Sequence, residues 1–378
     1  MSSARPSPSR FDLTAPTVAF IAASGLLWIA AATHHTDFWQ PGSWARADSG
    51  QYLAVATHGY HLFRCPPAYP PHSWCGDSGW FPAYPGVLAA LFALGLPHIG
   101  TAVLVSWLFA FATVLLVWHA FLRSLPRPLA WTGVSFVALA PSAVYMRAIF
   151  PLSMTVFFVV LALALLTAGR PWWASLAGAV AAAGYPTAVL LAPVLAIWVA
   201  WRSRARSSIG RLVHGAIGGA IVLCGVVVTF AIMRAQTGSW TAFFKTQTKY
   251  HHGFHSPLSI VHSNLHRAFG GPLDLLAVPA FEALFMSVVV LLVLAFYLLR
   301  RRGGGSGRVE LVVLSAVIVL WLVPRTQSNE DFFRTDALLA PIALLVARLP
   351  RQLGIAVVAG AGALAFFLGA GFFAGRYV

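Results

Sequence analysis

The sequence predicts an all-α polytopic membrane protein. Of its 378 residues, 59% are hydrophobic and only 9% are charged, whereas about a quarter of the residues of a soluble domain carry charge. Apolar runs follow one another along the chain, and many approach the roughly 20 residues that a helix needs to cross a bilayer. A chain of this length that spends so many residues in the membrane has no room for a large soluble catalytic domain.

The apolar runs divide the chain into a cytoplasmic tail, residues 1–15, and a single transmembrane domain, residues 16–378. The first run, 16–33, is longer than the ~7–15 apolar residues of a secretory signal, so we interpret it as an uncleaved anchor. The run 81–96 is short and contains prolines, and we interpret it as an interfacial or re-entrant helix. Ten further spans bring the total to about 11 transmembrane helices: 99–122, 129–144, 149–168, 172–184, 186–201, 212–233, 276–299, 309–324, 334–347 and 353–373.

The arginines support this threading, because cytoplasmic loops of membrane proteins are enriched in basic residues. A full span at 81–96 would move every later arginine cluster to the outside. The net charge of +15 then reflects orientation in a cell membrane, with the N-terminus cytoplasmic, and no basic helix or stripe suits a nucleic acid. The clusters on the cytoplasmic side are Arg5 and Arg10; Arg123 and Arg127; Arg170; Arg202, Arg204, Arg206 and Arg211; Arg300, Arg301, Arg302 and Arg308; Arg348 and Arg351.

Two long outer segments, 34–80 and 235–275, are expected to carry the functional site. Binding and catalytic groups usually lie on loops that a rigid scaffold holds. Most histidines lie in or beside these segments: His34, His35, His58, His61, His72, His98, His251, His252, His255, His262 and His266. Most acidic residues also lie on the outer side: Asp37, Asp48, Asp77, Asp274, Glu330, Asp331 and Asp336.

The cysteines have two different environments. Cys65 and Cys75 bracket a proline-rich stretch of the first outer segment. In an oxidising exterior we expect them to form a disulfide that stiffens this loop, whereas a reducing compartment would leave two free thiols. Cys224 lies in an apolar run and is interpreted as a small buried hydrophobe.

Residues 44–60 predict a helix that lies in the outer membrane interface. At helical spacing Tyr52, Val55 and Ala56 form an apolar face. The polar side comprises Arg46, Asp48, Ser49 and Gln51. Asp48 therefore has two interpretations, as the N-cap of this helix or as a carboxylate that acts at the bilayer surface.

The segment from Arg46 to Tyr60, followed by the string from Trp80 to Pro85, resembles the first luminal loop of the GPI mannosyltransferase II-like family of GT-C glycosyltransferases. The resemblance covers most of the chain, because it continues in the family's order at 141–150, 184–191, 238–247 and 334–341. This chain departs from the family pattern at four positions. Ala47 replaces a usual Trp, Arg147 a Glu, Tyr185 an Arg, and Thr335 a frequent Tyr.

The resemblance, as to a bacterial member, implies a GT-C-type bundle with interfacial helices in the first outer loop. It also implies an inverting transfer of mannose from polyprenyl-phosphate-mannose to a glycolipid or glycan acceptor on the extracytoplasmic face. A lipid-linked donor reaches such a site through the bilayer, and no glycine-rich phosphate loop or dinucleotide fingerprint supports a nucleotide sugar. We expect no cofactor and no metal, because His251, His252 and His255 lack a helical metal-binding spacing.

Asp48 is the expected general base, because a phosphate leaving group needs little protonation and a single displacement needs one carboxylate. Arg334 matches an arginine of the family and is expected to hold the departing phosphate, with pairing to Asp331 or Asp336 as the alternative. Further donor contacts are expected from Lys245, Lys249, Gln247, Arg147, Tyr145 and His35. Support of the acceptor or the loop is expected from Arg46, Gln51 and Tyr52.

A polytopic lipid or sugar transporter or flippase is the main alternative function, because many spans with few intramembrane polar groups also describe such proteins. The chain has no internal repeat, and its charge is concentrated at the outer surface. A binding-only member of the same fold would retain the scaffold and lose Asp48, which is present. Arabinose is the alternative to mannose as the transferred sugar.

Overall fold

A computed structural model describes residues 13–69, 72–203, 205, 207–250, 253–271, 277–302, 307–327 and 331–376. Most of the predicted tail, residues 1–15, lies outside these ranges. Other residues singled out by the sequence that also lie outside them are Arg204, Arg206, His251, His252, Asp274 and Glu330.

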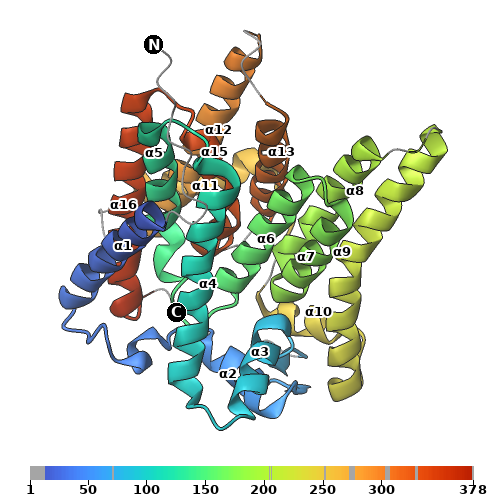
Figure 1. Cartoon of the computed structure of the whole chain (residues 1–378). Helices are drawn as coiled ribbons and strands as arrows, with labels where there is room; N and C mark the ends of the chain where they lie inside the picture. Colours follow the sequence, from blue (N-terminus) through green and yellow to red (C-terminus); the bar gives the residue numbers. More distant parts are fainter. Residues whose placement is uncertain are drawn as a thin grey trace, which may run out of the picture.

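The described chain folds into a helical bundle (Figure 1). Its longer helices are α1 (Thr14–Ala32), α4 (His98–Val117), α9 (Ser208–Thr237), α12 (Val278–Arg302), α13 (Arg308–Leu322) and α16 (Arg351–Phe373). Its shorter α-helices are α2 (Ser49–His58), α3 (Ala83–Phe92), α5 (Arg127–Ala138), α6 (Leu152–Thr167), α7 (Pro171–Gly184), α8 (Leu191–Arg202), α10 (Ala242–Gln247), α11 (Pro257–Phe269), α14 (Phe332–Thr335) and α15 (Ala343–Val346). Tighter or wider turns are η1 (Pro41–Trp44), the π-helical η2 (Trp118–Leu122), η3 (Pro141–Val144), η4 (Pro186–Leu190), η5 (Thr248–Tyr250), η6 (Pro324–Thr326) and η7 (Asp336–Ile342).

Six helical segments in the described ranges are long and apolar enough to cross a membrane: Thr14–Ala32, His98–Leu122, Ser208–Thr237, Val278–Arg302, Arg308–Thr326 and Arg351–Phe373. Helices α5 and α7 have 12 and 14 residues, fewer than the roughly 20 that span a hydrocarbon core. The total of about 11 spans therefore stays a prediction. Helix α3 has 10 residues, too few to cross a hydrocarbon core, and its interfacial or re-entrant placement stays a prediction.

Three predicted spans depart from a continuous α-helix at prolines. Residues 334–347 form α14, the 3-10 turn η7 and α15 instead of one helix, and Pro341 lies inside η7. The segments 129–144 and 186–201 contain the 3-10 turns η3 and η4, which begin at Pro141 and Pro186. Proline lacks the N–H that an α-helix needs and disfavours helical backbone in the residue before it. Hydropathy alone therefore overestimated the continuity of these helices.

The second outer segment, 235–275, is more helical than the loop that its polarity predicts. Helix α9 continues to Thr237 and ends at Gly238, which has a left-handed φ of 75°. The short helices α10 and α11 follow. The Ser256 hydroxyl caps α11 by accepting a hydrogen bond from the Ser259 N–H at 3.1 Å.

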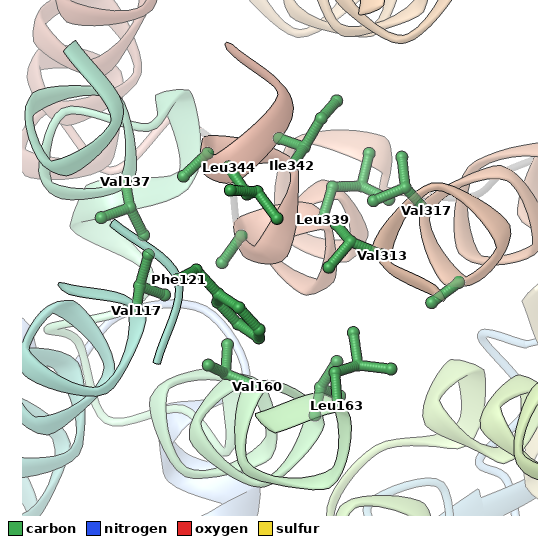
Figure 2. Close-up of a cluster of buried hydrophobic side chains, with 14 of the residues drawn as sticks. Val117, Phe121, Val137, Val160, Leu163, Val313, Val317, Leu339, Ile342 and Leu344 are labelled. Atoms are coloured by element: carbon green, nitrogen blue, oxygen red, sulfur yellow. The ribbon is translucent and has the colours of Figure 1, made fainter. Parts of the chain in front are cut away.

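The core lies where α4, α5, α6 and α13 meet the interrupted segment η7–α15 (Figure 2). Because lipid is as apolar as these side chains, close packing and not escape from water holds such helices together. The buried side chains labelled in this cluster are Val117, Phe121, Val137, Val160, Leu163, Val313, Val317, Leu339, Ile342 and Leu344.

Two of the predicted cytoplasmic arginine clusters meet on one carboxylate. Glu310 of α13 forms ion pairs with Arg300 of α12 at 3.3 Å and with Arg348 at 3.2 Å. On the same predicted side, Arg202 at the end of α8 donates a hydrogen bond to the carbonyl of Leu166 in α6. The structure thus brings together helix ends that the arginine pattern places on one side.

Helix α9 packs against α7 and α8 through glycines. At Gly225 a Cβ atom would fall on the carbonyl oxygen of Ala179 in α7, so only glycine permits this approach. The neighbouring Cys224 is exposed, and its interpretation as a buried residue was wrong. An α-helix that is apolar on all sides carries no periodicity that marks its buried face.

The first outer segment lies with α10 at the lower end of the bundle (Figure 1). Strands β1 (Leu62–Arg64) and β2 (Trp74–Gly76) pair antiparallel, with Phe63 opposite Cys75. Cys65 and Cys75 form a disulfide that closes the connection between the strands. The hairpin is thereby cross-linked where its two strands diverge.

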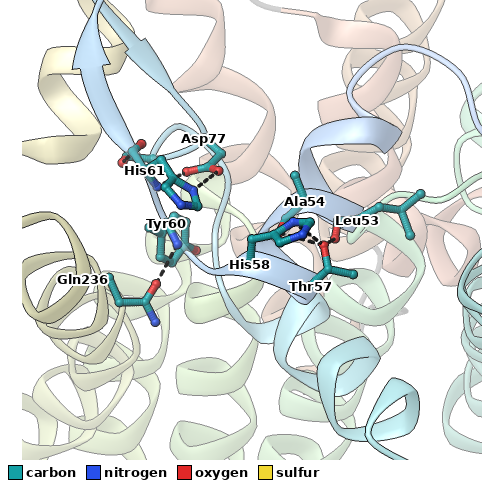
Figure 3. Close-up of polar contacts among 9 residues, drawn as sticks. Leu53, Ala54, Thr57, His58, Tyr60, His61, Asp77 and Gln236 are labelled. Atoms are coloured by element: carbon teal, nitrogen blue, oxygen red, sulfur yellow. Dashed lines mark hydrogen bonds and ion pairs between the residues drawn. The ribbon is translucent and has the colours of Figure 1, made fainter. Parts of the chain in front are cut away.

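A hydrogen bond attaches this segment to α9, and another lies within the segment (Figure 3). The Tyr60 N–H donates to Oε1 of Gln236 at 2.6 Å, and the His61 N–H donates to Oδ1 of Asp77 at 2.6 Å. Gly59 precedes them with a φ of 76°, and a Cβ there would lie 2.7 Å from the Gln236 oxygen. A glycine is therefore required where α2 ends against α9.

We expect Gly225→Ala to lower the free energy of unfolding by about 1–3 kcal/mol, because the added methyl group forces α7 and α9 apart. Gly25→Ala is the matched control, since a Cβ at this exposed position of α1 meets nothing within 4 Å. Thermal unfolding of both purified variants measures the effect. Equal midpoints for the two variants would contradict the predicted close approach.

Replacing Cys65 and Cys75 with serine should loosen the hairpin by about 2–3 kcal/mol, because the cross-link restricts the unfolded loop. Amide hydrogen exchange of residues 62–64 and 74–76 measures this change. Protection of α13 should stay constant and serves as the internal control. Unchanged protection of both strands would show that their pairing does not depend on the disulfide.

Candidate functional site

Asp48 stands at the N-cap position of α2, but its side chain does not cap the helix. The turn is closed by Ser49, whose hydroxyl donates to the Arg46 carbonyl at 2.6 Å and accepts from the Arg46 N–H at 3.1 Å. Ser49 is buried, although the sequence predicts it on the polar face. Tyr52, on the predicted apolar face, is buried. The Asp48 carboxylate remains available for a partner outside its own helix.

That partner is Arg334, which lies 286 residues further along the chain. Its Nη1 atom donates to Oδ2 of Asp48 at 2.7 Å and lies 3.3 Å from Oδ2 of Asp331. The Asp48 side chain is 36% exposed, whereas that of Arg334 is 10% exposed. The pair thus combines an accessible carboxylate with a guanidinium that is fixed in the protein.

Aromatic rings surround the buried side of Arg334. Its guanidinium carbon lies 5.6 Å from the ring centre of Tyr145, 5.2 Å from Phe150 and 5.4 Å from Phe333. The ring of Tyr52 packs against Phe150 with centroids 5.9 Å apart. The structure therefore brings Asp48, Arg334, Tyr145 and Tyr52 together, and ring faces attract the arginine cation.

Tyr52 beside the carboxylate keeps its proton. Burial raises the pKa of the Tyr52 hydroxyl, and the neighbouring Tyr185 and Asp48 raise it further. Tyr185 was noted in the sequence only as a departure from the family pattern. Its electrostatic effect on Tyr52 places it beside the site. The Tyr52 hydroxyl adds no negative charge there.

The turn η5 adds a second cation. Nζ of Lys249 lies 4.9 Å from the ring centre of Tyr250. Burial lowers the pKa of Lys249, and the carboxylate of Asp48 partly offsets this change. Burial and the same carboxylate raise the pKa of Tyr250. Lys249 and Tyr250 therefore lie within electrostatic range of Asp48.

Lys245 and Gln247 lie beside the β1–β2 hairpin and the residues that follow it. Nζ of Lys245 donates to the Ser239 hydroxyl at 3.1 Å and lies 4.7 Å from the ring centre of Trp74. Gln247 adjoins Gly79, where a Cβ would lie 3.1 Å from its Nε2 atom. The two lysines, which the sequence treated alike, thus have different surroundings.

Arg46 and Gln51 flank Asp48 in the chain. Nε of Arg46 is buried without a hydrogen-bond partner in the described ranges, and the Gln51 N–H donates to the Asp48 carbonyl at 2.9 Å. Arg147 and His35 are placed differently. Arg147 is buried against Phe20, and His35 is exposed beyond the end of α1. Among the contacts of the described chain, neither reaches Asp48 or Arg334.

Asp336, which the sequence offered as an alternative partner of Arg334, pairs with Arg325 instead. Nη1 and Nη2 of Arg325 donate to its two carboxylate oxygens at 3.0 and 2.6 Å. Glu282 of α12 interacts electrostatically with this pair. Its side chain is fully buried, and its oxygens have no hydrogen-bond partner in the part of the chain that is described. Sequence reasoning missed Glu282, although a lone acid in an apolar run is a recognisable signal.

The described residues contain no group of three or more His, Cys, Asp or Glu side chains arranged to hold a metal ion. Of the predicted histidine trio, His255 uses its backbone N–H to donate to the Thr326 carbonyl at 2.8 Å. The site consists of two carboxylates, Asp48 and Asp331, with two cations, Arg334 and Lys249. Such a set can accept a proton from a hydroxyl and can bind an anion in the same place.

No family model and no curated protein matches the chain. Among solved structures, the chain is similar to the oligosaccharyltransferase of Archaeoglobus fulgidus tethered with an acceptor peptide, with 10% identity over 97% of this chain and a TM-score of 0.49. It is similar at the same identity and TM-score, over 96% of its length, to the archaeal oligosaccharyltransferase AglB in complex with an inhibitory peptide and a dolichol-phosphate. The chain spans 56% of the length of each. Similarity of this strength assigns neither a family nor an activity.

Proposed function

We propose that this chain is an integral-membrane inverting glycosyltransferase that uses a polyprenyl-phosphate-linked sugar. Mannose is the proposed sugar, and a glycolipid or glycan on the extracytoplasmic face is the proposed acceptor. The enzyme would work in the cell membrane without a cofactor or a metal. Asp48 is the proposed general base. The observation that carries the proposal is the Asp48–Arg334 ion pair at 2.7 Å.

This ion pair supports a transferase because it places a base and a phosphate-binding cation on one spot. The acceptor hydroxyl would attack the anomeric carbon while its proton passes to Asp48. The bond between that carbon and the phosphate oxygen would break, and the configuration would invert. The polyprenyl phosphate would leave with its charge held by Arg334 and Lys249, and cations placed where charge develops lower the barrier to such a step.

Donor binding would also release the base. In the ion pair the Oδ2 atom of Asp48 already accepts a hydrogen bond from Arg334, so this oxygen is occupied and cannot at the same time accept from the acceptor hydroxyl. A donor phosphate that binds Arg334 competes for the same Nη1 donor. Asp48 would therefore become available when the donor is in place, and Asp331 at 3.3 Å would keep Arg334 in position.

A transporter is the second candidate function, because Glu282 is a buried acid inside a helix that is apolar and long enough to cross a membrane. Intramembrane ionisable groups often mark ion or substrate pathways. Movement of a labelled lipid-linked sugar across vesicles, blocked by Glu282→Gln and unaffected by Asp48→Asn, would favour this candidate over transfer.

Asp48→Asn should reduce transfer by about 10²- to 10⁴-fold, because an amide cannot accept the hydroxyl proton. Transfer of labelled mannose from polyprenyl-phosphate-mannose, by purified protein with a membrane lipid extract as acceptor, measures the effect. Asp37→Asn is the matched control, since Asp37 is an outer acid whose side chain accepts from the N–H of Trp39. Loss of activity in both variants, or in neither, would contradict the role of Asp48.

Lys249 should set the alkaline limit of activity. Burial lowers its pKa, so Lys249 loses its charge at a lower pH than an ordinary lysine and its phosphate contact weakens as pH rises through that value. In Lys249→Arg the charge persists, and the fall in kcat/KM should move to higher pH. The profile of Lys245→Arg should match that of the wild type. A shared alkaline limb in all three proteins would exclude Lys249 as its origin.

A further inference from the structure

Arg147 is a buried cation whose charge is not balanced by the described chain. Its side chain lies on the segment between η3 and α6 and is 2% exposed. Nη1 donates to the Ala143 carbonyl at 2.9 Å. Nε and Nη2 are buried and have no hydrogen-bond partner in the described ranges. A guanidinium in this state is strongly destabilising unless an acceptor reaches it.

The described carboxylates are engaged elsewhere. None of them forms an ion pair with Arg147 within the ranges that the structure covers, and five of them are bound to other cations or to histidine. The partners of these five are Arg334 for Asp48 and Asp331, Arg325 for Asp336, Arg300 and Arg348 for Glu310, and His61 for Asp77. Asp37 accepts from the Trp39 N–H, and Glu282 lies in the electrostatic field of Arg325. An acceptor for Arg147 therefore has to come from another molecule or from outside the described residues.

The surroundings of Arg147 contain a further donor. Its guanidinium carbon lies 4.4 Å from the ring centre of Phe20 in α1 and 5.9 Å from that of Trp107 in α4. Nε1 of Trp107 is also buried without a hydrogen-bond partner in the described chain. Three N–H-bearing atoms without acceptors thus gather between α1 and α4, and an anion with several oxygens is the chemistry that would satisfy them.

Among the contacts of the described chain, Arg147 touches neither Asp48 nor Arg334. A series of aromatic rings connects the surroundings of the two arginines. Its ring contacts run from the Arg147 side to the Arg334 side through Trp107, Trp44, Phe372 and Tyr145, with neighbouring centroids 5.4, 6.3 and 5.6 Å apart.

We propose that Arg147, together with Nε1 of Trp107, binds the phosphate group of a membrane lipid that enters between α1 and α4. Phosphate oxygens accept several N–H groups at once and match the fork of a guanidinium. The exposed faces of α1 and α4 next to this place are apolar, since they carry the side chains of Ile21 and Leu108. A hydrated ion would lose its water there, whereas a lipid tail would lie against these side chains. The site does not depend on the proposed sugar transfer.

Native mass spectrometry of the full-length protein in detergent, titrated with dioleoyl phosphatidic acid, tests this site. Arg147→Met should weaken binding of one lipid by about tenfold or more, since a charge-assisted contact to phosphate exceeds about 1.4 kcal/mol. Arg123→Met, which removes an exposed arginine, is the matched control. Millimolar inorganic phosphate should not displace the lipid.

Wild-type affinity in a folded Arg147→Met protein would overturn the proposal, and so would displacement of the lipid by inorganic phosphate, which would indicate a free-anion site. Trp107→Phe keeps an aromatic ring and removes the indole N–H, so it decides the question if Arg147→Met does not fold. It should weaken lipid binding about 2- to 10-fold. Unchanged binding in Trp107→Phe would then count against the site.

Discussion

The ion pair between Asp48 and Arg334 is the contact on which the candidate site depends. It joins the first outer segment to the start of the interrupted segment α14–η7–α15, 286 residues away in the chain. Further contacts hold the chain beside each partner in place. The Ser49 hydroxyl closes the turn before α2, and the buried Arg325–Asp336 pair anchors the chain two residues beyond Arg334. These contacts keep the accessible carboxylate of Asp48 beside the guanidinium of Arg334.

The interruptions of the predicted helices gather around this pair. Tyr145 follows η3, Tyr185 precedes η4, and Arg334 precedes η7. Irregular backbone within a membrane protein is tolerated where protein surrounds it, and here it carries the side chains that surround Arg334. Local rules that favour a continuous helix fail where the site is built, which is where such conflicts are expected in natural proteins.

Charge is distributed by pairing. Glu310 forms ion pairs with two arginines at the predicted cytoplasmic end. Arg334 forms ion pairs with two carboxylates at the predicted outer end. Within the described ranges two buried groups stand apart from this pattern: Glu282, which senses Arg325 only through space, and Arg147, which is covered by the ring of Phe20. A buried charge without a direct partner destabilises the folded state. A proton or a ligand that neutralises the charge of either residue would therefore stabilise it.

Local patterns in the sequence determined much of the molecule: apolar runs that form helices, the buried apolar face of α2 with Tyr52, and the two cysteines that meet across one hairpin. These features depend on neighbours within a few turns of chain. Only the tertiary structure decided that Arg334 pairs with Asp48 and Asp331 and not with Asp336, that Lys249 and not Lys245 lies near Asp48, and that Cys224 is exposed. Such choices depend on which helices pack together, and an all-apolar helix carries no periodicity that reveals its neighbours.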